Sequence, residues 1–302
     1  MENFDLIATN LYLALAMGEI ATPLHNLKYS KQYIEQPIHP KKGNAFPPDV
    51  ILFSKTYHHT LLLEIKNTTT SDFNETQAKN YMGVEPDHFK IVFTGYRELN
   101  RLKVDFSYKA HDQNEAHLAR DIEGSGMALP LLIFDAKKFE IRHSEKTKRF
   151  DFARLEKIFE KPLRLPIKSL EEIPRLIHFT PDTDNYEILA YVVTSLIALT
   201  KKETDDVTLL ELTKKSYSKL KLWDELDNRF KERLMKKVEE ILISSKNFGL
   251  DDYIEYTPKT KKVKIDIFDG SGQKAQAKLA AIQTRLKSPE AVIGSGQTTL
   301  SV

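Results

Sequence analysis

An acid and a lysine stand inside an apolar run at residues 60–66, where the chain reads Thr-Leu-Leu-Leu-Glu-Ile-Lys. A short run that is rich in branched apolar residues is typical of a buried strand. Side chains alternate along a strand, so Glu64 and Lys66 share one face and Ile65 points to the other. Burying both charges is unfavourable unless a cation and a water-filled cleft compensate. The run therefore predicts a sheet strand with a charged cleft beside it.

A second acid leads into another apolar strand. Asp49 follows a Pro-Pro pair and precedes Val-Ile-Leu-Phe at 50–53, and a connection at 57–59 joins the two strands into a predicted hairpin. His58 and His59 belong to this connection, and we expect both to face solvent. Two carboxylates on adjacent strands can hold Mg²⁺, which polarises a phosphate and activates a water. Lys66 is placed to orient that water or to neutralise developing charge.

These residues resemble the pattern of the PD-(D/E)xK nuclease superfamily, which includes restriction endonucleases, Holliday-junction resolvases and RecB-type nucleases. Pro48-Asp49 and Glu64-Ile65-Lys66 match that pattern, and the latter is the only Glu-x-Lys triplet in the chain. The resemblance implies that Asp49 and Glu64 bind the metal, that the carbonyl of Ile65 joins them, and that Lys66 is catalytic.

The order of the predicted elements agrees with the resemblance. A helix at 4–20 precedes strands at 32–38, 49–53 and 60–66, a helix at 73–82 with Asp72 as its N-cap, and a strand at 89–94. We therefore expect an α/β protein whose first hundred residues form a restriction endonuclease-like αβββαβ core.

Two further features extend the predicted site. Gln77 and Tyr81 lie four residues apart on one helix face, and their spacing resembles a motif that lines the DNA and metal site in RecB-type nucleases. The alternative is a simple packing pair. Superfamily members also often carry an extra acid on the first helix. Glu19 is preferred for this role, in which it would be the fourth residue that binds the metal. Glu35 is the alternative.

Composition restricts the setting. The chain has 302 residues, of which 41% are hydrophobic, and it has no cysteine. Disulfides and cysteine-ligated metals are thus excluded, which is compatible with a reducing cytoplasm. Acidic residues at the N-terminus argue against a signal peptide, and the apolar run at 188–199 is too short to span a bilayer. The formal net charge is only +2, so any contact with DNA must come from local basic patches.

The rest of the chain divides into three parts. A helix at 111–122 and a hairpin of strands at 129–135 and 139–142 complete the first domain, and prolines at 162, 166 and 174 mark a junction. We predict a nuclease domain at 1–160, a second domain at 161–269 and a flexible tail at 270–302, which contains a partner-binding helix at 273–286.

The second domain resembles a winged helix-turn-helix. It contains predicted helices at 186–199, 209–217 and 224–245, followed by strands at 253–256 and 262–265. A basic wing would contact DNA phosphates through Lys259, Lys261, Lys262 and Lys264, which makes binding salt-dependent. Acidic residues interleave with the basic residues of the last helix. The alternative is therefore a solvated face or a protein-pairing surface.

The leading hypothesis is a Mg²⁺-dependent DNA endonuclease, with Mn²⁺ able to substitute. The superfamily resemblance favours restriction or antiphage defence as its setting. One alternative is a DNA-binding or assembly protein that cuts only with a partner subunit, and another is a repair nuclease for branched DNA or RNA. Double-strand cleavage normally needs two such sites, so we expect a homodimer or a partner subunit and no membrane partner.

Overall fold

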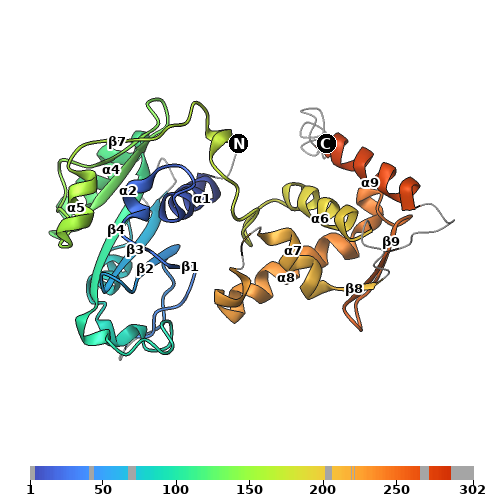
Figure 1. Ribbon diagram of the computed structural model, residues 1–302, viewed down its shortest axis with the longest axis horizontal. Coiled ribbons are helices and arrows are strands. Elements are labelled where there is room, and N and C mark those ends of the chain that lie inside the picture. The colour runs from blue at the N-terminus through green and yellow to red at the C-terminus, as the bar shows by residue number, and fades with distance from the viewer. Residues whose placement is uncertain are drawn as a thin grey trace, which may run out of the picture. The chain divides into compact units, whose positions relative to one another are not determined.

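The computed structural model describes residues 4–40, 44–66, 73–200, 206–218, 220, 222–265 and 272–286 (Figure 1). The chain forms two compact units, the first made of Met1–Leu176 with Asp224–Asp227 and the second of Ile177–Trp223 with Asn228–Val302. The predicted boundary between residues 160 and 161 falls before this division. Residues 161–176 belong to the first unit because Leu165 and Ile173 are buried and the backbone N–H of Leu176 donates to Asn10 Oδ1 at 2.8 Å.

A mixed sheet forms the centre of the first unit. Among the described residues it has seven strands, which lie side by side in chain order. They are β1 (Lys31–Ile34), β2 (Val50–Ser54), β3 (His59–Lys66), β4 (Lys103–His111), β5 (Leu131–Asp135), β6 (Glu140–His143) and β7 (Leu163–Arg164). The β3–β4 and β4–β5 pairs are parallel, and the other neighbours are antiparallel. The predicted α/β class is confirmed.

Helices cover both faces of this sheet. They are α1 (Phe4–Met17), α2 (Thr22–His25), α3 (Glu75–Met82), α4 (Glu115–Gly124) and α5 (Ala153–Phe159). Tyr81 of α3 stacks on Phe106 of β4 with ring centroids 4.4 Å apart, whereas Lys109 of the same strand lies with Nζ 3.0 Å from the ring centroid of Tyr12 on α1. Because side chains alternate along a strand, Phe106 and Lys109 point to opposite faces. Helices α3 and α1 therefore lie on opposite sides of β4.

The strand predicted at 89–94 is wrong. Pro86–Phe89 form a 3-10 helix, and helical turns continue through residue 95. The N–H of Phe93 donates to the carbonyl of Phe89 at 2.8 Å, and the two rings stack. Phe89 and Phe93 are buried while Ile91 is 64% exposed, which is the spacing of a helical face rather than of a strand. The strand that pairs with β3 is β4, further along the chain.

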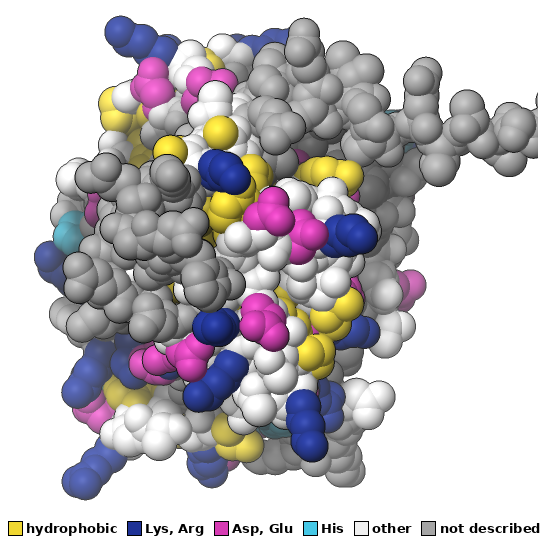
Figure 2. Space-filling view, turned by 90° about the vertical axis from the view of Figure 1, so that its right-hand side faces the viewer, with side chains coloured by type: hydrophobic (Ala, Val, Ile, Leu, Met, Phe, Trp, Pro, Cys, Tyr) yellow, Lys and Arg dark blue, Asp and Glu magenta, His cyan; other side chains and the backbone are white. Residues whose placement is uncertain are grey.

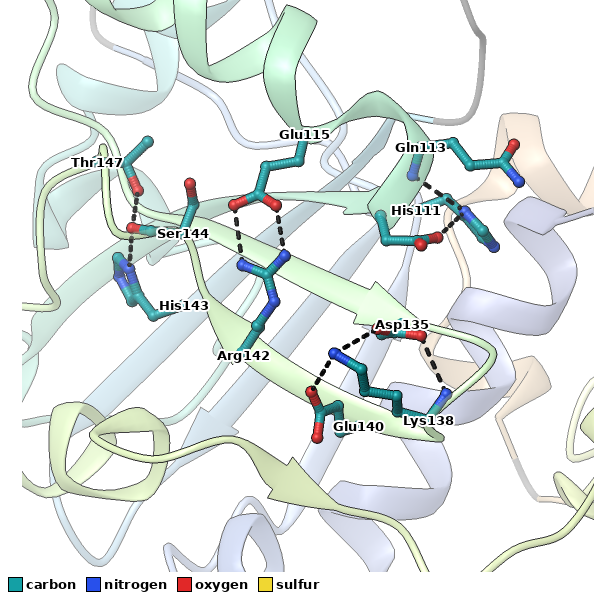
Figure 3. A network of polar contacts seen from close by, with 11 residues as sticks. His111, Gln113, Glu115, Asp135, Lys138, Glu140, Arg142, His143, Ser144 and Thr147 are labelled. Carbon is teal, nitrogen blue, oxygen red and sulfur yellow. Dashed lines mark hydrogen bonds and ion pairs between the residues drawn. The ribbon is translucent and has the colours of Figure 1, made fainter.

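A polar network joins α4 to the outer hairpin of the sheet (Figure 3). Glu115, the first residue of α4, accepts hydrogen bonds from both terminal nitrogens of Arg142 on β6, one of them 2.9 Å long. In the β5–β6 turn, Asp135 accepts the backbone N–H groups of Lys137 and Lys138, each at 3.0 Å. Two-pronged guanidinium–carboxylate contacts fix orientation as well as distance. The hairpin predicted at 129–142 is confirmed, and this network anchors it.

The second unit combines helices with a small sheet. Its elements are α6 (Asn185–Thr200), β8 (Asp206–Thr208), α7 (Leu209–Tyr217), α8 (Asn228–Ile243), β9 (Ile254–Thr257), β10 (Lys262–Ile265) and α9 (Gly272–Leu286). The three strands are antiparallel in the order β8-β10-β9. The helix predicted at 224–245 begins later, because Trp223–Glu225 form a separate 3-10 turn. Helix α8 buries the predicted apolar stripe of Phe230, Leu234, Val238, Ile241 and Leu242.

One capping box and one packed helix complete the description of this unit. Thr208 Oγ1 accepts the N–H of Glu211, and the Glu211 carboxylate accepts the N–H of Thr208, which starts α7 with a capping box. Helix α9 buries Leu279 and Ile282. The part of the predicted flexible tail at 272–286 is therefore a folded helix, and residues 270–271 and 287–302 lie outside the described residues. None of the described helices has both the length and the apolar character needed to cross a membrane.

Candidate active site

Asp49 and Glu64 are brought together by the pairing of β2 with β3. Val50 pairs with Leu63 in this antiparallel ladder, so Asp49, the residue before β2, falls opposite Glu64. Opposed residues of an antiparallel pair project from the same face of the sheet. Asp49 Oδ2 accepts the backbone N–H of Ile65 at 2.5 Å, which fixes the carboxylate at the end of β3.

Three side chains surround the Glu64 carboxylate. Tyr81 donates its hydroxyl to Oε2 at 2.6 Å, and Gln77 donates from Nε2 to Oε1 at 2.7 Å. Lys66 Nζ lies 3.2 Å from the same Oε1. Glu64 is only 7% exposed, so each of these contacts forms in a desolvated setting, where polar interactions are stronger than in water. The structure thus brings together Asp49, Glu64, Ile65, Lys66, Gln77 and Tyr81.

Helix α3 determines how Gln77 orients the lysine. Gln77 Oε1 accepts from Lys66 Nζ at 3.0 Å while its nitrogen donates to Glu64, so the amide bridges the cation and the anion. The helix starts at Glu75 because Asn74 Oδ1 accepts the N–H of Gln77 at 3.0 Å. The predicted N-cap, Asp72, lies outside the described residues.

Burial and mutual repulsion dominate the electrostatics of the pair. The pKa of Asp49 is raised well above its usual value, mainly by burial and next by the charge of Glu64, and the N–H of Ile65 offsets part of this effect. Burial and Glu64 also raise the pKa of Tyr81. Tyr81 therefore remains a protonated donor at any ordinary pH, and within the described part of the chain no cation forms an ion pair with Asp49.

Glu19, the preferred acid at the first helix, is not among the charges that act on Asp49. Among the described acids, those besides Glu64 whose charge raises the pKa of Asp49 are Glu35 and Asp5. Glu19 is exposed in the turn after α1, where its N–H donates to the carbonyl of Ala14. A helix of 14 residues is about 21 Å long, so the two ends of α1 cannot both reach Asp49. Asp5 lies in the first turn of α1, at the end of the helix whose charge acts on Asp49. An acid in that first turn was the sequence signal for this role, and it was overlooked.

The rival residue Glu35 lies close to the site through the backbone. Its N–H donates to the carbonyl of Asp49 at 3.2 Å, and its φ of 44° places it in the left-handed region at the end of β1. Among the described residues there is no group of three or more His, Cys, Asp or Glu side chains arranged to hold a metal. The oxygen donors that could serve a metal are therefore the two carboxylates and the carbonyl of Ile65.

His59 does not face solvent as the sequence predicted. It is fully buried as the first residue of β3, with Nε2 3.0 Å from Asp105 Oδ2 and Nδ1 2.9 Å from the hydroxyl of Tyr29. Asp105 also accepts the N–H groups of Asp151 and Phe152. Its neighbour His58 is partly buried, with Nδ1 2.5 Å from the Tyr96 hydroxyl. Sequence reasoning missed Asp105 because β4 itself was not predicted.

The predicted wing lysines lie on the β9–β10 hairpin of the second unit. Lys259, Lys261, Lys262 and Lys264 are all exposed, and Lys262 lies 3.9 Å from Asp206. On α8, Arg233 pairs with Asp182, so part of the positive charge of that helix is used within the unit. Figure 2 shows basic side chains interspersed with acidic ones on the face it presents. The hairpin thus presents four exposed lysines.

Two family models match the chain. One is the MJECL32 domain, which matches residues 5–178, and the other is the Domain of unknown function (DUF8601), which matches residues 181–285. No curated protein and no solved structure matches. The two matched ranges meet near residue 180, close to the division between the two compact units. Because the first model covers more than half of the 302 residues, the chain belongs to the MJECL32 domain family.

Proposed function

We propose that this protein is a metal-dependent endonuclease of the PD-(D/E)xK kind, which hydrolyses phosphodiester bonds in DNA. The observation that carries the proposal is the set of contacts in the first unit. Asp49 stands opposite Glu64, and Lys66, Gln77 and Tyr81 all contact the Glu64 carboxylate. The αβββαβ order that the resemblance implies also agrees with the succession from α1 to β4.

The donor set fits Mg²⁺, with Mn²⁺ as a substitute. Mg²⁺ prefers hard oxygen ligands and uses one or two protein carboxylates together with waters and phosphate oxygens. Asp49, Glu64 and the Ile65 carbonyl would supply such ligands, and a bound cation would offset the burial and the Glu64 charge that raise the pKa of Asp49. When bound, the metal would polarise the scissile phosphate and lower the pKa of a coordinated water.

The remaining side chains have separate roles. Lys66 places an ammonium beside Glu64, where it stabilises negative charge that develops on the phosphate. Gln77 holds Lys66 and Glu64 at a fixed separation through one amide group. Tyr81 links Glu64 to the segment before Asp49, since its hydroxyl lies 3.1 Å from the carbonyl of Pro47. Tyr81 thereby connects the strand that carries Glu64 to the segment that leads into Asp49.

The second unit would hold the nucleic acid or a partner. Its element order from α6 to β10 and its strand order β8-β10-β9 are similar to a winged helix-turn-helix. We propose that Lys259, Lys261, Lys262 and Lys264 contact DNA phosphates, which would position the duplex without reading its sequence. Restriction or antiphage defence in a cytoplasm is the setting that the superfamily resemblance favours.

Cleavage assays on the full chain test the proposal. Plasmid and single-stranded DNA are incubated with Mg²⁺ or Mn²⁺, and wild type is compared with Asp49→Ala and Lys66→Ala. We expect both variants to lose at least about a hundredfold in rate. Glu75→Ala is the matched control, because Glu75 lies on α3 but is 54% exposed and pairs with Lys79. Cleavage that persists in both site variants would remove the assignment.

A second function is favoured because both oxygens of the Glu64 carboxylate already have partners. Its two oxygens already accept contacts from Lys66, Gln77 and Tyr81, so the site is held closed by groups of its own chain. A DNA-binding or assembly protein that cuts only with a partner subunit agrees with this observation. Titration of the purified protein with Mn²⁺ by calorimetry separates the two functions, since metal binding without cleavage supports the second. Parallel assays on RNA and on branched DNA test a repair nuclease.

A further inference from the structure

Tyr108 lies next to Glu64 on the strand that the sequence did not reveal. In the parallel β3–β4 pair, Glu64 is in register with Tyr108, so the two side chains project from the same face of the sheet. The Tyr108 ring is completely buried. The structure therefore places an aromatic face directly beside the candidate carboxylate.

The ring also contacts the lysine of the site. Lys66 Nζ lies 5.5 Å from the Tyr108 ring centroid, within the range of about 6 Å in which a cation is attracted to an aromatic face. The same nitrogen bonds Glu64 at 3.2 Å and Gln77 at 3.0 Å. The Lys66 ammonium thus has two polar contacts, to Glu64 and Gln77, and one aromatic contact, to the Tyr108 ring.

Ring contacts surround the Tyr108 side chain. Its hydroxyl finds no hydrogen-bond partner among the described residues, and burial together with the charge of Glu64 raises its pKa. Phe106 meets the ring edge-to-face at 4.9 Å, and Phe73 does so at 5.9 Å. A buried hydroxyl without a partner is unfavourable, so the hydroxyl is dispensable for the packing of this residue and the ring is not.

We propose that Tyr108 is a positioning residue of the candidate site, whose ring holds the Lys66 ammonium beside Glu64. This inference rests on the proposed nuclease function for its effect on catalysis. Without the ring, the flexible four-carbon stem of Lys66 would gain alternative rotamers, and the ammonium would spend less time at the carboxylate. Tyr108 would then act on the reaction only through Lys66.

The test compares two substitutions at one position. Tyr108→Phe retains the ring and removes the hydroxyl, whereas Tyr108→Met retains bulk and removes the ring. In single-turnover cleavage of plasmid DNA with Mn²⁺, we expect Tyr108→Phe to stay within about twofold of wild type and Tyr108→Met to fall by roughly fivefold or more. Binding of the same DNA in Ca²⁺ is expected to change little in either variant. Equal losses in both variants, or no loss in Tyr108→Met, would overturn the inference.

A second measurement does not depend on activity. In protein with ¹⁵N-labelled lysine side chains, a ¹H–¹⁵N spectrum detects ammonium groups whose protons are protected, and the Lys66 signal is assigned by its loss in Lys66→Arg. We expect this signal in wild type and in Tyr108→Phe, and its broadening or shift toward the exposed lysines in Tyr108→Met. An unchanged signal in folded Tyr108→Met refutes the positioning role. If wild type retains the signal but cleaves no DNA, the proposed function fails while the contact stands.

Thermal unfolding checks that both variants are folded. If Tyr108→Met does not fold, Tyr108→Leu replaces it, and the Lys66 signal is compared with that of Tyr108→Phe in the same way. Removal of the unpartnered hydroxyl should leave Tyr108→Phe at least as stable as wild type. A marked loss of stability in Tyr108→Phe would show that the hydroxyl has a structural partner and would contradict the argument from the ring.

Discussion

Asp49 stands opposite Glu64 across two antiparallel strands, and each carboxylate lies within the electrostatic field of the other. When Asp49 is ionised, two like charges therefore lie close together at the end of a buried strand. Such an arrangement disfavours the folded state unless a cation is present. This relationship connects the stability of the first unit with the chemistry proposed for it.

Asp49→Asn should raise stability in the absence of divalent metal. The folded-state pKa of Asp49 lies above the unfolded value of 3.8, so the folded state binds more protons between these values. The free energy of unfolding consequently decreases as pH rises through that window. At neutral pH we expect a gain of roughly 1 kcal/mol in the variant, and denaturant titrations from pH 4 to pH 8 would show its weaker pH dependence.

The same variant gives a second readout with metal. Mg²⁺ or Mn²⁺ should raise the melting temperature of wild type, because a ligand that binds only the folded state stabilises it. Asp49→Asn should lose most of this shift. Asp87→Asn is the control, since its carboxylate is 44% exposed and pairs with Lys90. A wild-type protein that metal does not stabilise would contradict the proposed metal site.

Asp105→Asn should destabilise the first unit strongly. Asp105 accepts from His59 and from two backbone N–H groups, and an asparagine has only one acceptor oxygen for these donors. We expect a loss of about 3 kcal/mol in the free energy of unfolding. Asp151→Asn is the matched control, because its side chain is 73% exposed. A loss in the free energy of unfolding of less than about 1 kcal/mol, which is the effect of an ordinary surface substitution, would show that the buried network contributes little to stability.

The His59–Asp105 pair also predicts sensitivity to acid. Burial lowers the pKa of His59, so the unfolded state binds more protons below about pH 6.5. The pKa of Asp105 is also lowered, despite its burial, by its bonds to His59 and the backbone, and that stabilisation is lost as pH falls below its unfolded value of 3.8. Both effects decrease stability on acidification. When the free energy of unfolding is measured by denaturant titration at decreasing pH, Asp105→Asn should lose less stability on acidification than wild type.

Lys109→Met should stabilise the protein at neutral pH. Lys109 is 2% exposed, and burial lowers its pKa well below 10.5. The unfolded state therefore binds more protons below pH 10.5, and the free energy of unfolding increases as pH rises toward that value. Methionine avoids this penalty, so we expect a gain of roughly 1–3 kcal/mol at pH 7 that shrinks by pH 10. Lys103→Met, at an exposed position of the same strand, should show no comparable gain.

Removing the lysines at the hairpin tip should weaken the salt dependence of DNA binding. Lys259 and Lys261 are exposed, and each phosphate contact contributes about 0.9 to the slope of log affinity against log salt. The double variant Lys259→Gln with Lys261→Gln should reduce that slope by up to about 1.8. Lys157→Gln with Lys161→Gln, two exposed lysines of the first unit, is the control pair. An unchanged slope at the hairpin would favour protein pairing as the role of this surface.

Local rules explain why the centre of the site could be predicted. Alternation along β3 places Glu64 and Lys66 on one face, and four-residue spacing on α3 places Gln77 beside Tyr81. Both rules act within one element and need no knowledge of the rest of the fold. The hairpin that pairs Asp49 with Glu64 follows from two neighbouring apolar runs. These contacts therefore depend on sequence patterns of a few residues.

The failures concern contacts between distant segments. Asp5 rather than Glu19 acts on Asp49 because the orientation of α1 on the sheet decides which end comes close. The apolar residues from Phe89 to Phe93 belong to helical turns, although their composition suits a strand. Tyr108 and Asp105 were not recognised because β4, whose polar residues interrupt its apolar pattern, was not predicted. Tertiary packing overrides composition in each case.

The side chains that bond the Glu64 carboxylate, Lys66, Gln77 and Tyr81, lie within 17 residues of it in the chain. Contacts between residues close in the chain form with a small loss of loop entropy and allow fast folding. This group of bonds can thus form early, before the outer strands β5 to β7 are added. Variation in the outer strands β5 to β7 should accordingly disturb these bonds less than variation in β4, which pairs with β3 and contributes Tyr108.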